Sequence, residues 1–142
     1  MSAAAKTSST GRRAPEGTAA PATVADIMVK PPVVAAPHTT VAEARALLRQ
    51  GPMRHLPVLD GELLVGIVSE RDLDRAPSED TPLSAVMTRT VFVLSPHNSI
   101  RDAARRFRKR RFGAMPVLDG RRLIGMVSVV DVLRAPAEQP KV

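Results

Sequence analysis

Where a β-rich run leads directly into a helical segment, this chain twice places a serine hydroxyl three residues before an aspartate. Ser69 and Asp72 form the first pair, and Ser128 and Asp131 form the second. This spacing predicts a capping box, and each helix cap stabilises the fold by about 1 kcal/mol. The same atoms suit a ligand, because a strand-to-helix junction presents free N–H groups to phosphate and its carboxylate can bind a ribose diol. Since the pair occurs twice in the same context, we favour ligand binding over capping alone.

The two pairs belong to an internal repeat with an offset of 59 residues. The segment Pro57-Val58-Leu59-Asp60-Gly61 recurs as Pro116-Val117-Leu118-Asp119-Gly120. Residues 26–75 align with residues 85–134 without a gap, and 17 of these 50 positions are identical. The chain therefore contains one structural unit written twice.

Each unit is predicted to fold as β-α-β-β-α, with a further short helix in front of it. Apolar runs bounded by proline predict first strands at 33–35 and 91–94. Asp-Gly pairs at 60–61 and 119–120 predict two hairpins. A unit of this size buries little core alone, so we expect the two units to pack sheet to sheet around a shared core. The predicted fold class is α/β, of the α+β type, with pseudo-twofold symmetry.

Composition divides the chain into four parts. Residues 1–22 hold almost no large apolar side chain and are expected to be a disordered tail. The first repeat is expected over 23–80, the second over 81–136, and a loose C-terminus over 137–142.

Several function classes are excluded by the residues present. The chain has no Cys, so it can hold neither a disulfide nor a thiolate metal site. It has no nucleotide-binding glycine loop and no nucleophile–base pair, so we do not expect an enzyme. His38 and His97 lack metal-ligand spacing with other His or acidic residues, so we do not expect a metal site. No apolar run approaches 18 residues, and a cytoplasmic location is expected.

At this point the repeats resemble a known family. The segments that carry the resemblance are Arg54-His55-Leu56-Pro57-Val58-Leu59-Asp60 and Leu64-Val65-Gly66-Ile67-Val68-Ser69-Glu70-Arg71-Asp72-Leu73, with their copies at 113–119 and 123–128. They are similar to a tandem cystathionine β-synthase (CBS) domain pair over about four-fifths of the chain. The resemblance implies a regulatory module that binds AMP, ADP, ATP or S-adenosylmethionine in clefts between the repeats. Such a module signals by a change of conformation or association and usually forms a homodimer, and here its protein partner is unknown.

The resemblance also implies roles for individual residues. Asp72 and Asp131 would bind ribose, and Ser69 and Ser128 would contact ribose or phosphate. The side chains that would reach phosphate are those of Arg54, His55 and Arg71. The positions that would frame the adenine are Val33, Thr90 and Val91. The second copy has Gly113, Ala114 and Val130 in place of the three phosphate contacts, so we expect asymmetric binding, with Arg111 or Lys109 as a possible substitute.

The charge of the chain is also asymmetric. Residues 24–83 carry a net charge of −3 and residues 84–136 carry +8. Most of the excess lies in one predicted helix, at Arg101, Arg105, Arg106, Arg108, Lys109 and Arg110. Three interpretations stay open: a solvated helix face, a face that docks on the acidic first repeat across a dimer, and a binding surface for nucleic acid or another polyanion. A structural dimerisation subunit is a further alternative function.

Overall fold

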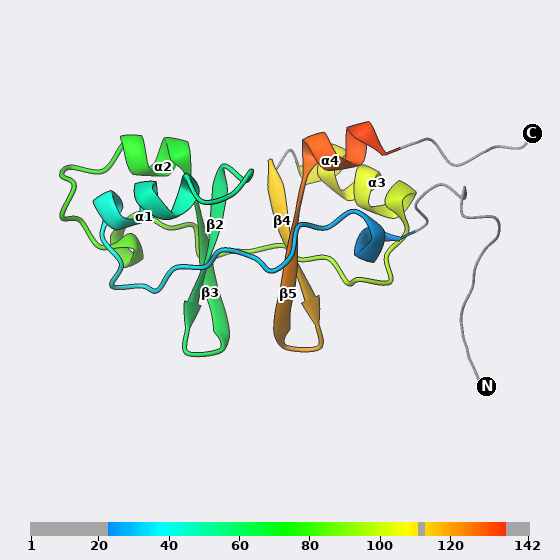
Figure 1. Ribbon diagram of the computed structural model, residues 1–142, viewed down its shortest axis with the longest axis horizontal. Coiled ribbons are helices and arrows are strands. Elements are labelled where there is room, and N and C mark those ends of the chain that lie inside the picture. Colours follow the sequence, from blue (N-terminus) through cyan, green and yellow to red (C-terminus); the bar gives the residue numbers. More distant parts are fainter. Residues whose placement is uncertain (1–22, 111–112, 136–142) are drawn as a thin grey trace, which may run out of the picture.

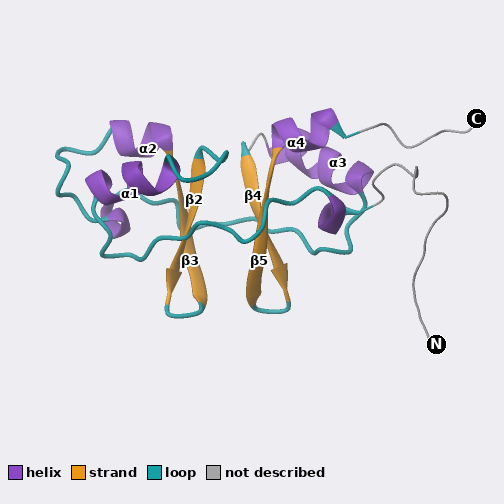
Figure 2. Ribbon diagram, in the orientation of Figure 1, coloured by secondary structure: helices purple, strands orange, loops and turns teal. Residues whose placement is uncertain are grey.

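The computed structural model describes residues 23–110 and 113–135 and consists of two similar halves side by side (Figure 1). In each half the helices gather at one end of a two-stranded antiparallel sheet (Figure 2). The first half contains α1 (Val41–Leu48), β2 (His55–Asp60), β3 (Leu63–Ser69) and α2 (Glu70–Asp74). The second contains α3 (Ile100–Arg110), β4 (Ala114–Asp119), β5 (Arg122–Ser128) and α4 (Val129–Arg134). The mixed helix and strand content confirms the predicted fold class, while the expected tail, the C-terminal end and Arg111 lie outside the described residues.

The two hairpins form where the Asp-Gly pairs predict them. Gly61 and Gly120 have φ angles of 64° and 66°, a left-handed conformation that glycine adopts without steric cost. In the first hairpin the register sets His55 opposite Ser69. The imidazole and the helix-capping hydroxyl therefore start from the same end of the sheet.

The predicted first strand of each repeat is reduced to a single bridge. Ala35 pairs with Val58, and Leu94 pairs with Val117, both in parallel. In the first repeat, extending this parallel ladder in either direction would require an N–H group from Pro37 or Pro57, and proline has none. Prolines at 96 and 116 block the same extension in the second repeat. The sequence prediction of strands at 33–35 and 91–94 was therefore too long.

Each short leading helix packs against the opposite repeat. The 3-10 helix η2 (Val24–Asp26) places Val24 in the core of the second half, and η3 (Leu83–Ala85) places Leu83 in the core of the first half. Bridges from Val29 to Met126 and from Thr88 to Ile67 continue the exchange along β5 and β3. The two halves are thus interlocked, a feature that the repeat pattern alone did not predict.

The described residues form two apolar cores, one in each half, in place of the single shared core expected. The first contains Val41, Leu56 and Leu83, and the second contains Val24, Phe107 and Met115. Each crossing segment supplies apolar side chains to one core. Because the two cores are separate, a cleft can form between the two halves.

Candidate functional site

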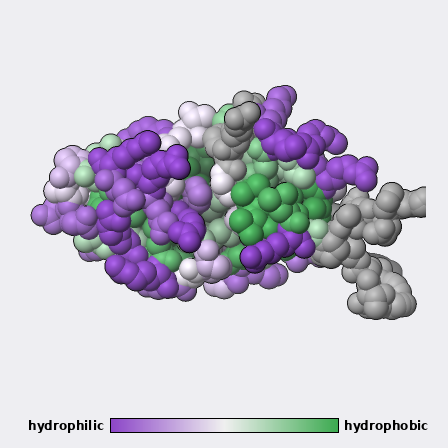
Figure 3. Space-filling view, turned by 90° about the horizontal axis from the view of Figure 1, so that it is seen from above, coloured by the Kyte–Doolittle hydropathy of each residue, from purple (hydrophilic) through white to green (hydrophobic). Residues whose placement is uncertain are grey.

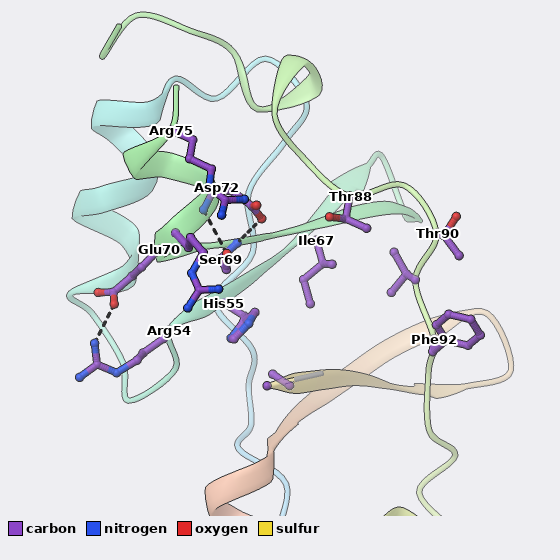
Figure 4. Close-up of a pocket in the computed structure, with 14 residues that line it drawn as sticks. Arg54, His55, Ile67, Ser69, Glu70, Asp72, Arg75, Thr88, Thr90 and Phe92 are labelled. Carbon is purple, nitrogen blue, oxygen red and sulfur yellow. Dashed lines mark hydrogen bonds and ion pairs between the residues drawn. The ribbon is translucent and has the colours of Figure 1, made fainter. Parts of the chain in front are cut away.

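A cleft of about 550 Å³ lies between the first repeat and the segment that leads into the second. Figure 4 shows the helix junction at Ser69 and Asp72 on one side of this cleft and Thr90 and Phe92 on the other. The structure brings together seven of the predicted ligand residues, namely Arg54, His55, Ser69, Arg71, Asp72, Thr90 and Val91. It also adds seven lining residues that were not predicted as ligand contacts, namely Ile67, Glu70, Arg75, Thr88, Phe92, Gly113 and Ala114.

The capping box fixes the carboxylate of Asp72 at the start of α2. The Ser69 backbone N–H donates to Asp72 Oδ2 at 2.9 Å, and the Asp72 backbone N–H donates to Ser69 Oγ at 3.1 Å. Within the described residues, no hydrogen bond reaches the other carboxylate oxygen of Asp72. The capping prediction is therefore confirmed, and one oxygen stays available to a ligand.

Three arginines line the same side of the cleft. Arg54 Nη1 lies 2.7 Å from Glu70 Oε1, and both side chains are largely exposed, at 77% and 49%. An exposed ion pair of this kind contributes little stability, so Arg54 can exchange its partner at low cost. Arg71 lies on α2 and Arg75 is the C-cap residue of this helix, and neither makes an ion pair with another described residue. Arg75 recurs as Arg134, a repeat identity that could have indicated it from the sequence.

The opposite wall is mainly apolar. Thr88 exchanges two backbone hydrogen bonds with Ile67, at 2.9 and 3.0 Å, which holds this wall against β3. Gly66 permits the approach, since a β-carbon there would lie 2.6 Å from Met87 Sδ. No backbone hydrogen bond joins Thr90 or Val91 to another described residue. Their N–H and C=O groups are therefore available to read the edge of a flat ligand.

His55 begins β2 and lies where the first half meets the second, because it lines the cleft with Gly113 and the small hollow with Met126. Burial lowers the pKa of its imidazole, and the nearby charges of Asp72 and Glu70 partly oppose this effect. A β-carbon on Gly113 would be only 2.8 Å from His55 Cε1. Burial thus favours the neutral imidazole, which lies against the start of the second repeat.

The second repeat does not reproduce this arrangement. Ser128 and Asp131 form the same capping box, with both hydrogen bonds at 3.1 Å. Val33 lines a small apolar hollow of about 20 Å³ together with His55, and neither Ser128 nor Asp131 contributes to it. The structure therefore does not bring these three predicted residues together.

The remaining sequence predictions concern the cations of the second repeat, metal ligands and membrane-spanning segments. None of the α3 cations with described side chains lines the larger cleft, Lys109 included, and Arg111 lies outside the described residues. Over 23–110 and 113–135, no three His, Asp or Glu residues gather as metal ligands would. Within the same ranges, no helix is long and apolar enough to cross a membrane.

The family follows from a comparison with known proteins. The CBS domain model matches this chain twice, at residues 24–79 and 83–138. The chain belongs to the CBS domain family. A solved CBS domain pair, in complex with 5′-methylthioadenosine and S-adenosyl-L-methionine, superposes with a TM-score of 0.73 at 30% identity, over 79% of this chain and 93% of that one. The tandem CBS architecture expected from the sequence is confirmed.

Other relatives carry the same pair in different settings. The CBS domain-containing protein YhcV of Bacillus subtilis is 28% identical over 77% of this chain and 81% of its own length. The L-aspartate semialdehyde sulfurtransferase of Methanocaldococcus jannaschii is 31% identical over 78% of this chain, which spans only 22% of that enzyme. The cytosolic domain of the Mg²⁺ channel MgtE, in complex with ATP, superposes with a TM-score of 0.70 at 27% identity, over 79% of this chain and 48% of that one.

Proposed function

We propose that this CBS pair is a regulatory module that binds an adenine nucleotide in the cleft beside Ser69 and Asp72. The observation that carries the proposal is the polarity of this cleft, which has three arginines at one end and an apolar wall at the other. Support also comes from the two related structures, one with S-adenosyl-L-methionine and 5′-methylthioadenosine and one with ATP.

The middle of the cleft suits a ribose. Asp72 is held in place by its capping bond and has one carboxylate oxygen unpaired among the described residues. A fixed carboxylate can accept hydrogen bonds from the two hydroxyls of a ribose diol. The Ser69 hydroxyl accepts from the Asp72 N–H and can donate its own proton to the ligand.

The apolar end suits the base. Ile67, Val91 and Phe92 offer apolar surface, and the unpaired backbone groups of Thr90 and Val91 offer donors and acceptors to the adenine edge. Backbone groups of this kind select one base by hydrogen bonding while the apolar side chains bury its faces.

The cationic end favours a phosphorylated ligand. Arg54, Arg71 and Arg75 outnumber the carboxylates of Glu70 and Asp72 in the lining. Guanidinium groups bind phosphate with paired N–H donors. We therefore assign AMP, ADP or ATP to this cleft in preference to S-adenosylmethionine, whose sulfonium is cationic. The junction at Ser128 and Asp131 lacks these arginines and would take a ligand without phosphate, or none.

The mechanism that we propose is population shift, without catalysis. A nucleotide that touches both α2 and the start of the second repeat stabilises the arrangement in which these parts lie together. A partner protein would read that arrangement, and the proposal places the chain in the cytoplasm.

A homodimer completes the proposed function. On α4, Val130 and Leu133 are 45% and 76% exposed, and Figure 3 shows an apolar patch over the half that contains α3 and α4. Exposed apolar patches are typical of association surfaces. Sedimentation of a Leu133→Asp variant tests this association, and an unchanged dimer would exclude this patch as the interface.

A thermal-shift screen tests the ligand class. AMP, ADP, ATP, S-adenosylmethionine and adenosine are compared at equal concentration. A ligand at 100 times its Kd should stabilise the fold by about 2.7 kcal/mol. The proposal expects the phosphorylated ligands to raise the Tm more than S-adenosylmethionine does, and no shift with any of them would exclude it.

A further inference from the structure

Helix α3 carries far more positive charge than its place in the fold requires. Its eleven residues include six basic side chains and a single acid, Asp102. Ile100, Ala103 and Phe107 form its buried side, with 7%, 0% and 2% of their surface exposed. The five basic residues whose side chains are described are all exposed and therefore occupy the side that faces away from the core.

A hollow of about 300 Å³ lies at the middle of this basic side. Arg105, Arg106 and Lys109 line it from α3, and an apolar floor is formed by Phe92, Val93 and Met115. Asp102 lies 3.5 Å from Arg105 Nη1 and 3.4 Å from Arg106 Nε, and both arginine side chains are about half exposed or more. Since exposed pairs at such distances contribute little, both arginines remain available to a stronger anion.

The first repeat shows that the fold does not need these cations. With the offset of 59 residues, Arg105, Arg106 and Lys109 correspond to Ala46, Leu47 and Gln50. Leu47 packs against the core of its own half. The same three helix positions are thus occupied by apolar or neutral residues in the first repeat and by cations in the second.

We propose that this side of α3 binds the phosphate backbone of nucleic acid. Helix α3 presents the described side chains of four arginines and one lysine. The guanidinium group of arginine has the fork geometry that matches phosphate. Arg101, Arg105 and Lys109 follow one another every four residues, about 6 Å apart along the helix axis. A strand advances about 3.4 Å per phosphate, so this row spans several phosphates.

Two other polyanions fit the surface less well. A membrane surface needs broad apolar surface next to the charges. The apolar side chains of α3 itself are buried, and in the hollow Phe92 and Val93 are each only 36% exposed and Met115 is 1% exposed. A small phosphorylated ligand could occupy the hollow, but it would meet only three of the exposed cations of α3, namely Arg105, Arg106 and Lys109. Contacts from Arg105, Arg106 and Lys109 to phosphate carry no sequence information, so we expect binding that is independent of base sequence.

The test measures the salt dependence of binding to labelled oligonucleotides by fluorescence anisotropy. The test variant is R105Q/R106Q/K109Q. The control variant, R49Q/R121Q/R122Q, removes the same charge from exposed positions elsewhere. If five cations each neutralise one phosphate of a duplex, affinity should fall about 500-fold between 50 and 200 mM salt, and only about 12-fold for the test variant.

The control variant should keep most of the wild-type salt dependence. An equal loss in both variants would show that net charge alone drives binding and would overturn the proposal. So would absence of wild-type binding at 50 mM salt, or stronger binding to anionic vesicles than to the oligonucleotide. An ATP-dependent thermal shift, measured on the same variants, reports separately on the cleft, so either proposal can fail without the other.

Discussion

The imidazole of His55 lies directly against Gly113, close enough that a β-carbon on Gly113 would be 2.8 Å from His55 Cε1. Gly113 corresponds to Arg54 in the first repeat. The missing side chain in the second repeat therefore gives room to the histidine of the first. This contact is one of the points at which the pseudo-twofold symmetry of the site is broken.

Replacing Gly113 by alanine should weaken nucleotide binding. The new methyl group pushes the imidazole of His55 out of its position, and both residues line the cleft. We expect a loss of several-fold in ATP affinity, measured by calorimetry. The matched control is Gly51→Ala, whose β-carbon would make an ordinary 3.7 Å contact with Val33. If both variants bind ATP like the wild type, the His55 position has no role in binding.

The lowered pKa of His55 predicts a pH-dependent stability. Burial keeps the folded pKa below the ordinary value of 6.5, so the unfolded chain takes up a proton first as the pH falls. Stability should therefore be fully present above about pH 6.5 and decline as the pH falls toward the folded pKa. Urea unfolding between pH 7.5 and 5 measures this decline. It should be smaller in a His55→Gln variant, and identical profiles would contradict the assignment.

Gly66 should tolerate no side chain. A β-carbon there would lie 2.6 Å from Met87 Sδ and 3.0 Å from the Thr88 carbonyl oxygen, where Thr88 bridges to β3. Gly66→Ala should lower the free energy of unfolding by about 1–3 kcal/mol, the usual cost of overpacking. Urea denaturation measures the loss, again with Gly51→Ala as control. A loss of the same size in the control would point to a general effect of alanine.

Arg54 and Arg71 should distinguish phosphorylated from unphosphorylated ligands. Hydrogen bonds to charged groups contribute about 1.5–3 kcal/mol, and the exposure of Arg54 places it at or below the lower end. The double variant R54Q/R71Q should bind ATP at least about tenfold more weakly. Its affinity for adenosine should not change. Equal losses for both ligands would show that these arginines act through the fold rather than through phosphate.

Much of the fold and of the main cleft could be predicted from the sequence. The Asp-Gly pairs, the capping boxes and the repeat offset are local patterns, and each predicts its own element without knowledge of the rest of the chain. The cleft residues Ser69 and Asp72 were found for this reason. Arg75 was missed although it recurs in the repeat as Arg134.

The remaining features depend on contacts between distant segments. The packing of Val24 and Leu83 in opposite halves is invisible to an alignment of the repeats, because both copies carry the same short helix. The shortening of the first strands depends on prolines in two segments that must first be paired. The wall formed by Ile67, Thr88 and Phe92 likewise arises only once the crossing segments are in place.

The most direct test of the nucleotide site compares Asp72→Ala with Asp131→Ala. Both substitutions remove the same capping box, so their effects on stability should match, at about 1 kcal/mol each. Calorimetry with AMP should show a loss of about 10- to 100-fold in affinity for Asp72→Ala, as expected for a charged hydrogen-bond acceptor, and little change for Asp131→Ala. Equal losses in the two variants, or none in either, would contradict the assignment of the ligand to the Ser69–Asp72 cleft.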